Sequence, residues 1–358
     1  MPTAPRVIVV GAGIVGASLA WHLAAGGADV TVLESGDRGG VATPRSWAWI
    51  NASWGNPEPY VALRLQAIDD WHRLQRALPG LPVTWSGGLL WDLPRSGLEA
   101  YVRQHRGWGY DLRLVEREEI GRLEPALADP PALAVHAPGE GAVDPLAAAL
   151  MLLQAAEDLG ARVETGGTVS ALVAAGGRVT GVQVGGARLP ADAVVVAAGA
   201  GSPALCATVG CDMPVVPSPG LLVSTRPVAP LLNGLVMAPE VHVRQLADGR
   251  LLAGADFGGG DPGADQAVEA AAVMDALRRL LTPAEGLELD GWAVGLRPMP
   301  ADELPILGRP AGLSGLTIAA MHSGITLAPA VGRLLAAEIL QGEISPLLAP
   351  FRPDRFAA

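Results

Sequence analysis

Apolar runs separated by glycine-rich turns organise the N-terminal part of the chain. Residues 7–10 (VIVV) form a run that is typical of a buried parallel strand. Residues 17–25 then follow a helical pattern that closes at Gly26 and Gly27, and a second strand is expected over residues 30–33. This order predicts a strand–helix–strand unit at the start of the chain.

Two later stretches repeat the pattern of an apolar strand followed by a glycine-containing turn. In residues 191–205, ADAVVVAAGAGSPAL, the strand ends in Ala-Gly-Ala-Gly, which includes Gly199. In residues 315–340, GLTIAAMHSGITLAPAVGRLLAAEIL, a strand, a turn and a helix follow one another. Ligands bind outside the carboxyl ends of the strands in doubly wound folds, so these turns are expected at the binding edge.

Shorter strand-like runs occur in the third quarter of the chain: GLLVSTRPV, EVHVRQL and GRLLAGADF. The ADG between the last two predicts a hairpin turn. Residues 267–286, AVEAAAVMDALRRLLTPAEG, have the pattern of an amphipathic helix, which we expect to pack on the sheet that these runs form. This part of the chain therefore predicts a second, mainly antiparallel unit.

Composition and charge narrow the classes of function. Half of the 358 residues are apolar, which allows a large core and favours two domains. A net charge of −11 without a basic stripe argues against a nucleic-acid partner. All 25 basic residues are arginine, which excludes lysine Schiff-base chemistry. Any cation that contacts a substrate must therefore be an arginine or a protonated histidine.

Cysteine content and the N-terminus bear on the compartment. Cys206 and Cys211 provide neither a disulfide framework nor a cysteine-rich metal site, so we interpret them as unreactive thiols and expect no metal. The opening MPTAPRVIVVGAG enters a strand at once and leaves no room for a signal peptide, and no apolar run is long enough to span a bilayer. We expect a soluble, cytoplasmic protein without a membrane partner; its oligomeric state is not indicated.

The turn after the first strand has the spacing G-x-G-x-x-G, formed by Gly11, Gly13 and Gly16. Gly11 permits the tight turn, Gly13 lets the backbone approach a pyrophosphate, and Gly16 lets the helix pack on the strand. The helix N-terminus adds free N–H groups and the positive end of its dipole. Glu34, at the end of the second strand, can bind both ribose hydroxyls, and its charge disfavours NADP. A dinucleotide, NAD or FAD, is therefore expected here.

Three further segments favour FAD, the longer cofactor. The loop of residues 39–55, GGVATPRSWAWINASWG, contains Thr43, Arg45 and Ser46 and could close over the pyrophosphate. The other two are the strand–turn segments described above, whose turns and helix end offer further backbone groups. A plain NAD-dependent dehydrogenase is the alternative, and it predicts a colourless preparation.

The order of these motifs resembles the D-amino-acid oxidase family of flavoproteins, near glycine oxidase and sarcosine oxidase. The G-x-G-x-x-G loop, VVVAAGAGS, GLRPMPADELPILG and HSGITLAPAVGRLLA stand in the family's order, and the resemblance covers the whole chain. It implies an α/β fold in which a Rossmann-like FAD-binding domain is joined to a mainly antiparallel β-sheet (α+β) substrate domain. The FAD-binding domain would be discontinuous, with residues 1–80, 140–215 and 291–358, and the substrate domain would comprise residues 81–139 and 216–290.

The resemblance also implies which residues hold FAD. Those that match the family's contacts are Ile14, Val15, Glu34 and Ser35 at the adenosine and phosphates, Thr43, Arg45 and Ser46 over the pyrophosphate, Val169 at the adenine, and Gly324, Ile325, Thr326 and Leu327 beside the flavin. Helix-end N–H groups in this last segment would stabilise negative charge on reduced flavin. Gly199 and Ser323 complete the expected cofactor contacts. No cysteine follows Arg297 and no histidine lies in residues 39–55, so FAD is expected to be noncovalent.

Arg297 is the main candidate for substrate binding. In the family the arginine of the G-L-R-P segment binds the substrate carboxylate, and Arg297 stands in that place. Its planar guanidinium can form two parallel hydrogen bonds to a carboxylate. The alternative is a structural ion pair between Arg297 and a carboxylate of the protein.

Two histidines and two tryptophans are further candidates. His322 precedes the flavin-facing turn and either tunes the flavin or caps the turn. His242 stands where the family often has a tyrosine; with Arg244 on the same strand face, it either lines the pocket or faces solvent. Trp47 and Trp49 are expected to wall the pocket. The final turn, MHSG, is shorter than in glycine oxidase and lacks its second arginine, which leaves the substrate open.

The implied reaction is oxidation of the C–N bond of an amino acid or N-alkyl amino acid. Hydride would pass from Cα to flavin N5, and O2 would be the acceptor that yields H2O2. A substrate bound as the neutral amine needs no dedicated base, so orientation would do most of the work. Two alternatives stay open: a dehydrogenase of the same fold that uses another electron acceptor, and a flavin subunit of a hetero-oligomeric oxidase.

Overall fold

A six-stranded sheet forms one half of the molecule, with the order β19–β20–β13–β1–β2–β9. The computed structural model describes residues 4–52, 55–256 and 261–356. All neighbouring pairs in this sheet are parallel except β19 and β20. The strands are β1 (Arg6–Val10), β2 (Asp29–Glu34), β9 (Arg162–Thr165), β13 (Ala193–Val196), β19 (Ile306–Gly308) and β20 (Leu316–Ala320). The expected strands near residues 7–10, 30–33 and 191–205 are confirmed, and the third lies beside the first.

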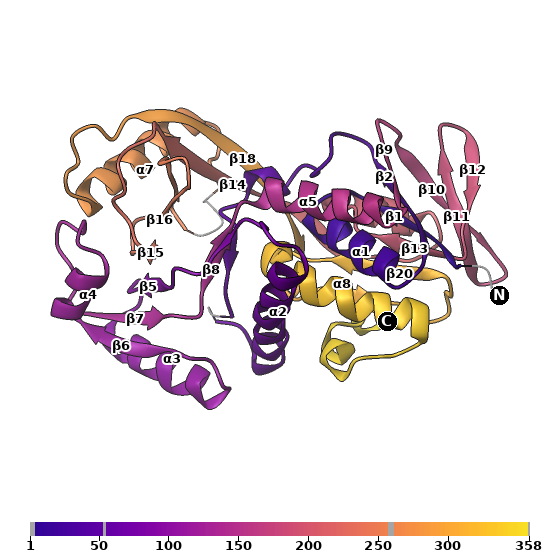
Figure 1. The fold of residues 1–358 in the computed structure, drawn as a ribbon, viewed down its shortest axis with the longest axis horizontal. Coiled ribbons are helices and arrows are strands. Elements are labelled where there is room, and N and C mark those ends of the chain that lie inside the picture. Colours follow the sequence, from indigo (N-terminus) through magenta and orange to yellow (C-terminus); the bar gives the residue numbers. More distant parts are fainter. Residues whose placement is uncertain (1–3, 53–54, 257–260, 357–358) are drawn as a thin grey trace.

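Both faces of this sheet are covered by other elements, because the side chains of strand β1 are apolar on both faces. Val7 and Val9 of β1 belong to the core shared with the helices, whereas Ile8 and Val10 belong to the core shared with a small antiparallel sheet (Figure 1). The helices are α1 (Ile14–Ala25), α5 (Pro145–Asp158) and α8 (Gly324–Gln341), and the small sheet consists of β10 (Val169–Ala175), β11 (Arg178–Val184) and β12 (Ala187–Pro190). The predicted helices over residues 17–25 and in 315–340 are present as α1 and α8.

Close packing fixes α1 against α8. A Cβ added to Gly332 of α8 would lie 2.3 Å from the Ser18 hydroxyl oxygen and 2.7 Å from His22 Nδ1, so only glycine fits at this crossing. The Ser18 hydroxyl also donates to the Ala328 carbonyl oxygen at 2.7 Å. These contacts fix the position of α1, which follows the glycine loop, relative to α8, which begins in the HSGIT segment.

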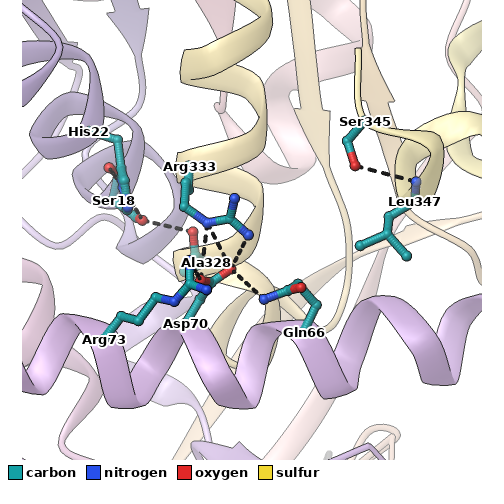
Figure 2. A network of polar contacts seen from close by, with 9 residues as sticks. All are labelled: Ser18, His22, Gln66, Asp70, Arg73, Ala328, Arg333, Ser345 and Leu347. Carbon is teal, nitrogen blue, oxygen red and sulfur yellow. Dashed lines mark hydrogen bonds and ion pairs between the residues drawn. The ribbon is translucent and has the colours of Figure 1, made fainter. Parts of the chain in front are cut away.

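A buried carboxylate ties a third helix, α2 (Glu58–Ala77), to α8 (Figure 2). Asp70 is 2 % exposed and accepts hydrogen bonds from Arg333, with Nη2 to Oδ2 at 2.8 Å. Arg73 lies 3.5 Å from the same carboxylate, and Gln66 donates to it at 3.5 Å. A buried carboxylate needs such partners, so this cluster sets the position of α2 relative to α8.

The free energy of unfolding is expected to fall as the pH drops below neutrality, in part through His22. Desolvation lowers the pKa of His22 from 6.5 to about 4, with Asp70 favouring and Arg333 opposing its protonation. The unfolded chain therefore binds this proton near pH 6.5 and the folded chain only near pH 4, so the stability contributed by neutral His22 is lost as the pH falls through this window.

Replacing His22 with glutamine should flatten that slope, measured by urea unfolding across the same pH window. His72→Gln on α2, where the His72 ring stacks on Trp85 with a centroid separation of 4.0 Å, is the matched control. An unchanged slope in His22→Gln would contradict the assignment.

The other half of the molecule is an eight-stranded sheet with the order β18–β14–β17–β16–β15–β5–β7–β6. It is antiparallel except for the pair β15 and β5. Helix α7 (Gln266–Leu280) covers one face (Figure 1), where Leu277 of the helix shares a core with Val223 and Val243. The strands are β5 (Gly88–Leu90), β6 (Arg113–Glu116), β7 (Leu133–Ala137), β14 (Val215–Thr225), β15 (Leu235–Met237), β16 (His242–Gln245), β17 (Leu251–Gly254) and β18 (Leu289–Pro300). The predicted amphipathic helix and the antiparallel β16–β17 hairpin are confirmed.

The remaining elements connect the two halves or border them. A small sheet pairs β8 (Gly141–Val143) with β3 (Trp49–Ile50) and β4 (Val83–Thr84); the other elements are α3 (Arg95–Gly107), α4 (Arg117–Leu123), α6 (Ser202–Ala207), η1 (Thr43–Arg45), η2 (Gly199–Gly201), η3 (Pro346–Phe351) and η4 (Pro353–Phe356). The α/β fold with a Rossmann-like sheet and a separate antiparallel sheet is thus confirmed.

The predicted division into domains stays a prediction. Strand β18 spans the expected boundary at residue 291, so Arg297 is carried by the antiparallel sheet. Among the helices that the structure describes, none has both the length and the apolar character needed to cross a bilayer.

Candidate functional site

A cavity of about 610 Å³ is lined by residues from both halves of the molecule. This volume lies within the range of small-molecule and cofactor sites. The lining comes from the turn between β1 and α1, the end of β2, residues 40–49, the start of β10, η2, β18 and the first turn of α8. The cavity therefore lies at the carboxyl ends of the parallel strands, as the strand–turn motifs predict.

The turn between β1 and α1 depends on two glycines. Gly11 has φ +106°, and a Cβ there would lie 2.4 Å from the Ala197 carbonyl oxygen. A Cβ on Gly16 would lie 1.9 Å from the Gly11 carbonyl oxygen, so Gly16 allows helix α1 to pack against the turn. The Thr43 hydroxyl accepts a hydrogen bond from Ile14 N at 3.0 Å, which joins the loop of residues 40–49 to the start of α1.

The carboxylate of Glu34 organises the end of β2. It is 8 % exposed and accepts hydrogen bonds from Ala12 N at 2.8 Å and Gly36 N at 2.9 Å, and from the Ser35 hydroxyl at 3.3 Å. An ionised carboxylate has about four lone-pair sites, so these three bonds leave capacity for a ligand hydroxyl. Because Glu34 also lines the cavity, it can hold a ribose there.

The first turn of α8 lies at the same cavity. Gly324, Ile325 and Thr326 line it and lie in the first helical turn, where N–H groups have no intrahelical acceptor. The Thr326 hydroxyl donates to the Trp49 carbonyl oxygen at 3.0 Å, and Trp71 Nε1 donates to the Ile325 and Thr326 carbonyl oxygens at 3.1 Å each. These bonds hold a second helix N-terminus, suited to negative charge, at the other part of the cavity.

Arg297 lines the cavity from β18 and is half-buried. Its Nη2 donates to the hydroxyl of Ser218, the residue directly opposite on β14, at 3.2 Å, and to the Pro219 carbonyl oxygen at 3.1 Å. A Cβ on Gly295 would lie 2.8 Å from the Arg45 carbonyl oxygen, so β18 approaches the loop of residues 40–49 closely. The guanidinium thus stands at the boundary between the two halves.

His322 lines the cavity beside Arg297 and is neutral at pH 7. Desolvation, together with the positive charges of Arg64 and Arg297, lowers the pKa of His322 to about 4. One imidazole nitrogen lies 3.1 Å from the Ser323 hydroxyl oxygen. Burial and the two positive charges disfavour the protonated form of any base at this place, an amine included.

The two tryptophans lie where the sequence predicts, but His242 lies behind them. Trp47 and Trp49 are 2 % and 7 % exposed and both line the cavity. Trp47 Nε1 donates to the Leu252 carbonyl oxygen at 3.1 Å, and Trp49 Nε1 donates to Glu140 at 2.8 Å. His242 is buried, with its ring centroid 6.2 Å from that of Trp47.

His242 and Arg244 therefore follow neither of the two expected arrangements. Both are less than a tenth exposed, so neither faces solvent. Neither is among the described residues that line the cavity. Arg244 donates instead to the Val143 carbonyl oxygen at 3.3 Å. His242 Nε2 lies 3.7 Å from Asp92 Oδ2, and the expected catalytic role of His242 stays a prediction.

Sequence reasoning missed Arg64 and Asn51, which also line the cavity. Arg64 is 5 % exposed and donates to both the backbone and the side-chain oxygen of Asn51 and to the Ser323 hydroxyl. One signal could have revealed it: α2 buries the stripe Tyr60, Leu63, Arg64, Ala67 and Trp71, so an arginine stands among apolar positions of the helix.

Most of the expected site residues meet at this one cavity. Those that line it are Gly11, Gly13, Ile14, Val15, Glu34, Ser35, Thr43, Arg45, Ser46, Trp47, Val169, Gly199, Arg297, His322, Ser323, Gly324, Ile325 and Thr326. Gly16, Leu327 and His242 lie outside its lining: Gly16 packs the turn, Leu327 is fully buried, and His242 lies behind Trp47. The arrangement is that of a dinucleotide-dependent enzyme, with an arginine where the parallel-sheet half meets the antiparallel half.

Comparison with known proteins identifies the family. The family model described as FAD dependent oxidoreductase (DAO) matches residues 6–338. Glycine oxidase of Geobacillus kaustophilus is 31% identical, covering 98% of this chain and 96% of the relative, and glycine oxidase of Pseudomonas aeruginosa is 30% identical, covering 97% and 98%. The crystal structure of the Geobacillus enzyme superposes with a TM-score of 0.89 over 99% of this chain and all of that chain, at 28% identity.

A second solved structure is similar at the same identity. Iminodiacetate oxidase from Chelativorans sp. BNC1 superposes with a TM-score of 0.85 at 28% identity, covering 97% of this chain and 99% of that chain. The chain therefore belongs to the DAO family of FAD-dependent oxidoreductases.

The cavity fits FAD on observations of its own. Two helix N-termini line it, Glu34 has hydrogen-bonding capacity for a ribose, and Gly11 and Gly13 bring backbone without side chains to its wall. These features are distributed over a cavity that reaches from Glu34 and Val169 to Arg297. A dinucleotide with a long second half is the ligand that uses all of them.

Proposed function

We propose that this chain oxidises the C–N bond of an amino acid or N-alkyl amino acid, with O2 as the electron acceptor. The observation that carries the proposal is Arg297, held by Ser218 and Pro219 at the end of the cavity that also contains His322 and the first turn of α8. Two similar proteins, a glycine oxidase and an iminodiacetate oxidase, support a carboxylated amine as substrate and an oxidase reaction.

FAD would be held noncovalently along the cavity. Glu34 would bind the adenosine ribose, the N-terminus of α1 with Thr43, Arg45 and Ser46 would bind the pyrophosphate, and residues 324–326 would contact the flavin. No cysteine is among the lining residues that the structure describes. When bound there, FAD would supply the hydride acceptor for the substrate Cα–H bond and the means of passing both electrons to O2, with H2O2 as the product.

The chain itself would supply orientation, charge and exclusion of water. Arg297 would bind the substrate carboxylate through two parallel hydrogen bonds and so fix the direction of the Cα–H bond. Trp47 and Trp49 would wall the site against water. Desolvation and the positive charges of Arg64 and Arg297, which together lower the pKa of His322, would also lower the pKa of the substrate amine and so favour the neutral amine, whose Cα–H can leave as hydride.

Anaerobic titration of the purified protein with D-, L- and N-methyl amino acids tests this function. Loss of the oxidised flavin absorbance with at least one carboxylated amine is expected, followed by H2O2 formation when O2 is admitted. A yellow protein that no carboxylated amine bleaches would refute the proposed substrate class. Reduction without H2O2 on aeration would favour the alternative of a dehydrogenase, and activity only after addition of another subunit would favour a hetero-oligomeric oxidase.

A further inference from the structure

Arg64 is a buried cation at the substrate end of the cavity. It projects from α2, is 5 % exposed and lines the cavity. Its Nε donates to the Asn51 carbonyl oxygen at 3.1 Å, Nη2 to Asn51 Oδ1 at 2.8 Å and Nη1 to the Ser323 hydroxyl at 3.0 Å. The guanidinium carbon also lies 5.1 Å from the centre of the Tyr60 ring.

All of these partners are neutral. Among the described residues no carboxylate lies within ion-pair distance of Arg64, whereas Arg333, which also lies at the contact of α2 and α8, pairs with Asp70 at 2.8 Å. A buried guanidinium without a counter-charge is costly, because its hydration is lost and no anion replaces it. The missing negative charge is therefore expected from a ligand in the cavity.

The free hydrogen-bonding groups of Arg64 match a carboxylate. Three of the five guanidinium N–H groups make the bonds above, so one N–H remains on each terminal nitrogen. One N–H from each terminal nitrogen is the set that binds both oxygens of a carboxylate. Asn51 and Ser323 hold the guanidinium in place, so little side-chain freedom is lost when a ligand binds.

Arg64 and Arg297 line the same cavity from different elements. One comes from α2 in the parallel-sheet half and the other from β18 in the antiparallel half, and His322 lies within electrostatic range of both. If Arg297 binds one carboxylate, as in the proposed function, a ligand with a single carboxylate would leave the charge of Arg64 uncompensated. A ligand with two carboxylates on either side of an amine would place the second one on Arg64.

We propose that the substrate is an amine with two carboxylates, such as an N-carboxymethyl amino acid or an aminodicarboxylic acid, and that Arg64 binds the second carboxylate. The inference rests on the proposed function, in which Arg297 binds the first. Arg64 thereby determines specificity: it distinguishes dicarboxylates from glycine-like monocarboxylates. This second arginine comes from α2, not from the final MHSG turn.

Binding of unreactive ligands to the FAD-loaded protein tests the role of Arg64 separately from turnover. Diglycolate has two carboxylates on an ether oxygen in place of the amine, and methoxyacetate has one. Affinities are measured from the change in flavin absorbance and by calorimetry. Wild-type protein is expected to bind diglycolate more tightly than methoxyacetate, and Arg64→Gln should lower the diglycolate affinity by at least about 30-fold with a much smaller effect on methoxyacetate.

Two further variants make the result specific. Arg64→Lys keeps the charge but cannot form two parallel bonds, so it should weaken diglycolate binding to an intermediate degree and remains informative if Arg64→Gln does not fold. Arg76→Gln, at an exposed position of the same helix, should stay within about twofold of wild type.

Three results would overturn the inference. One is equal wild-type affinity for the two ligands, and another is an unchanged diglycolate preference in every folded Arg64 variant. The third is a shift of the flavin midpoint potential in Arg64→Gln with ligand preference intact, which would assign Arg64 to the flavin. Failure of every amine to reduce the flavin would instead refute the proposed function, while the diglycolate comparison would still decide the role of Arg64.

Discussion

Arg297→Ala is expected to lower kcat/KM for a carboxylated amine by about 30-fold to several thousand-fold. Removing one member of a desolvated charge pair typically costs about 2–5 kcal/mol, much of it because the other charge is left without a partner. Here that other charge is the substrate carboxylate. The loss should appear in both KM and kcat, because the carboxylate also sets the direction of the Cα–H bond.

The experiment needs a control for general damage to the sheet. Arg226→Ala removes an exposed arginine that follows β14 and pairs with Glu288 at 3.1 Å, an ion pair worth less than about 1 kcal/mol. Kinetics under saturating O2 and urea unfolding are measured for both variants. If Arg297→Ala lowers the free energy of unfolding but leaves kcat/KM unchanged, Arg297 is structural and the carboxylate anchor lies elsewhere.

Gly11→Ala is expected to abolish stable FAD binding and to lower the free energy of unfolding by about 3 kcal/mol. Two costs add at this position. The backbone has φ +106°, which side chains rarely adopt, and the new Cβ would lie 2.4 Å from the Ala197 carbonyl oxygen. The turn must shift to relieve the contact, and it then no longer presents the N–H groups of α1 to the pyrophosphate.

Gly27→Ala is the control that separates the cost of the positive φ from the cost of the steric contact. Gly27 also has a positive φ, +87°, but no atom lies within 4 Å of the Cβ position, so its substitution should cost only about 1 kcal/mol and leave FAD binding intact. Urea unfolding of the apoproteins and the fraction of FAD retained after ultrafiltration give the two readouts. Equal effects in the two variants would show that backbone conformation, and not crowding at the glycine loop, is the cause.

The sequence predicted helices, strands and turns well where their conformation depends on residues that are close together in the chain. The G-x-G-x-x-G spacing, the apolar run before it and Glu34 after it are confined to one strand–helix–strand unit, so the conformations of β1, α1 and β2 follow from neighbouring residues. The same holds for the β16–β17 hairpin and for α7, whose apolar stripe meets the antiparallel sheet. The role of Arg297 could be anticipated only because its segment resembles a known family.

The environment of a side chain could not be predicted in this way. Arg64 lies 13 residues from Asn51 and 259 residues from Ser323, and only the packing of α2 against α8 brings the three together. His242 and Arg244 share a strand face, as alternation predicts, but whether that face meets solvent, a pocket or another side chain depends on where residues 47–49 fold.

By itself, the sequence determined the dinucleotide-binding unit, the two kinds of sheet and the absence of lysine chemistry, because these depend on short-range periodicity, glycine spacing and composition. Only the tertiary structure decided which charges share the cavity. Desolvation and charge–charge interactions depend on distances between residues far apart in the chain. For this reason, the neutral state of His322 and the burial of the Arg64 cation could be recognised in the tertiary structure but not from any sequence motif.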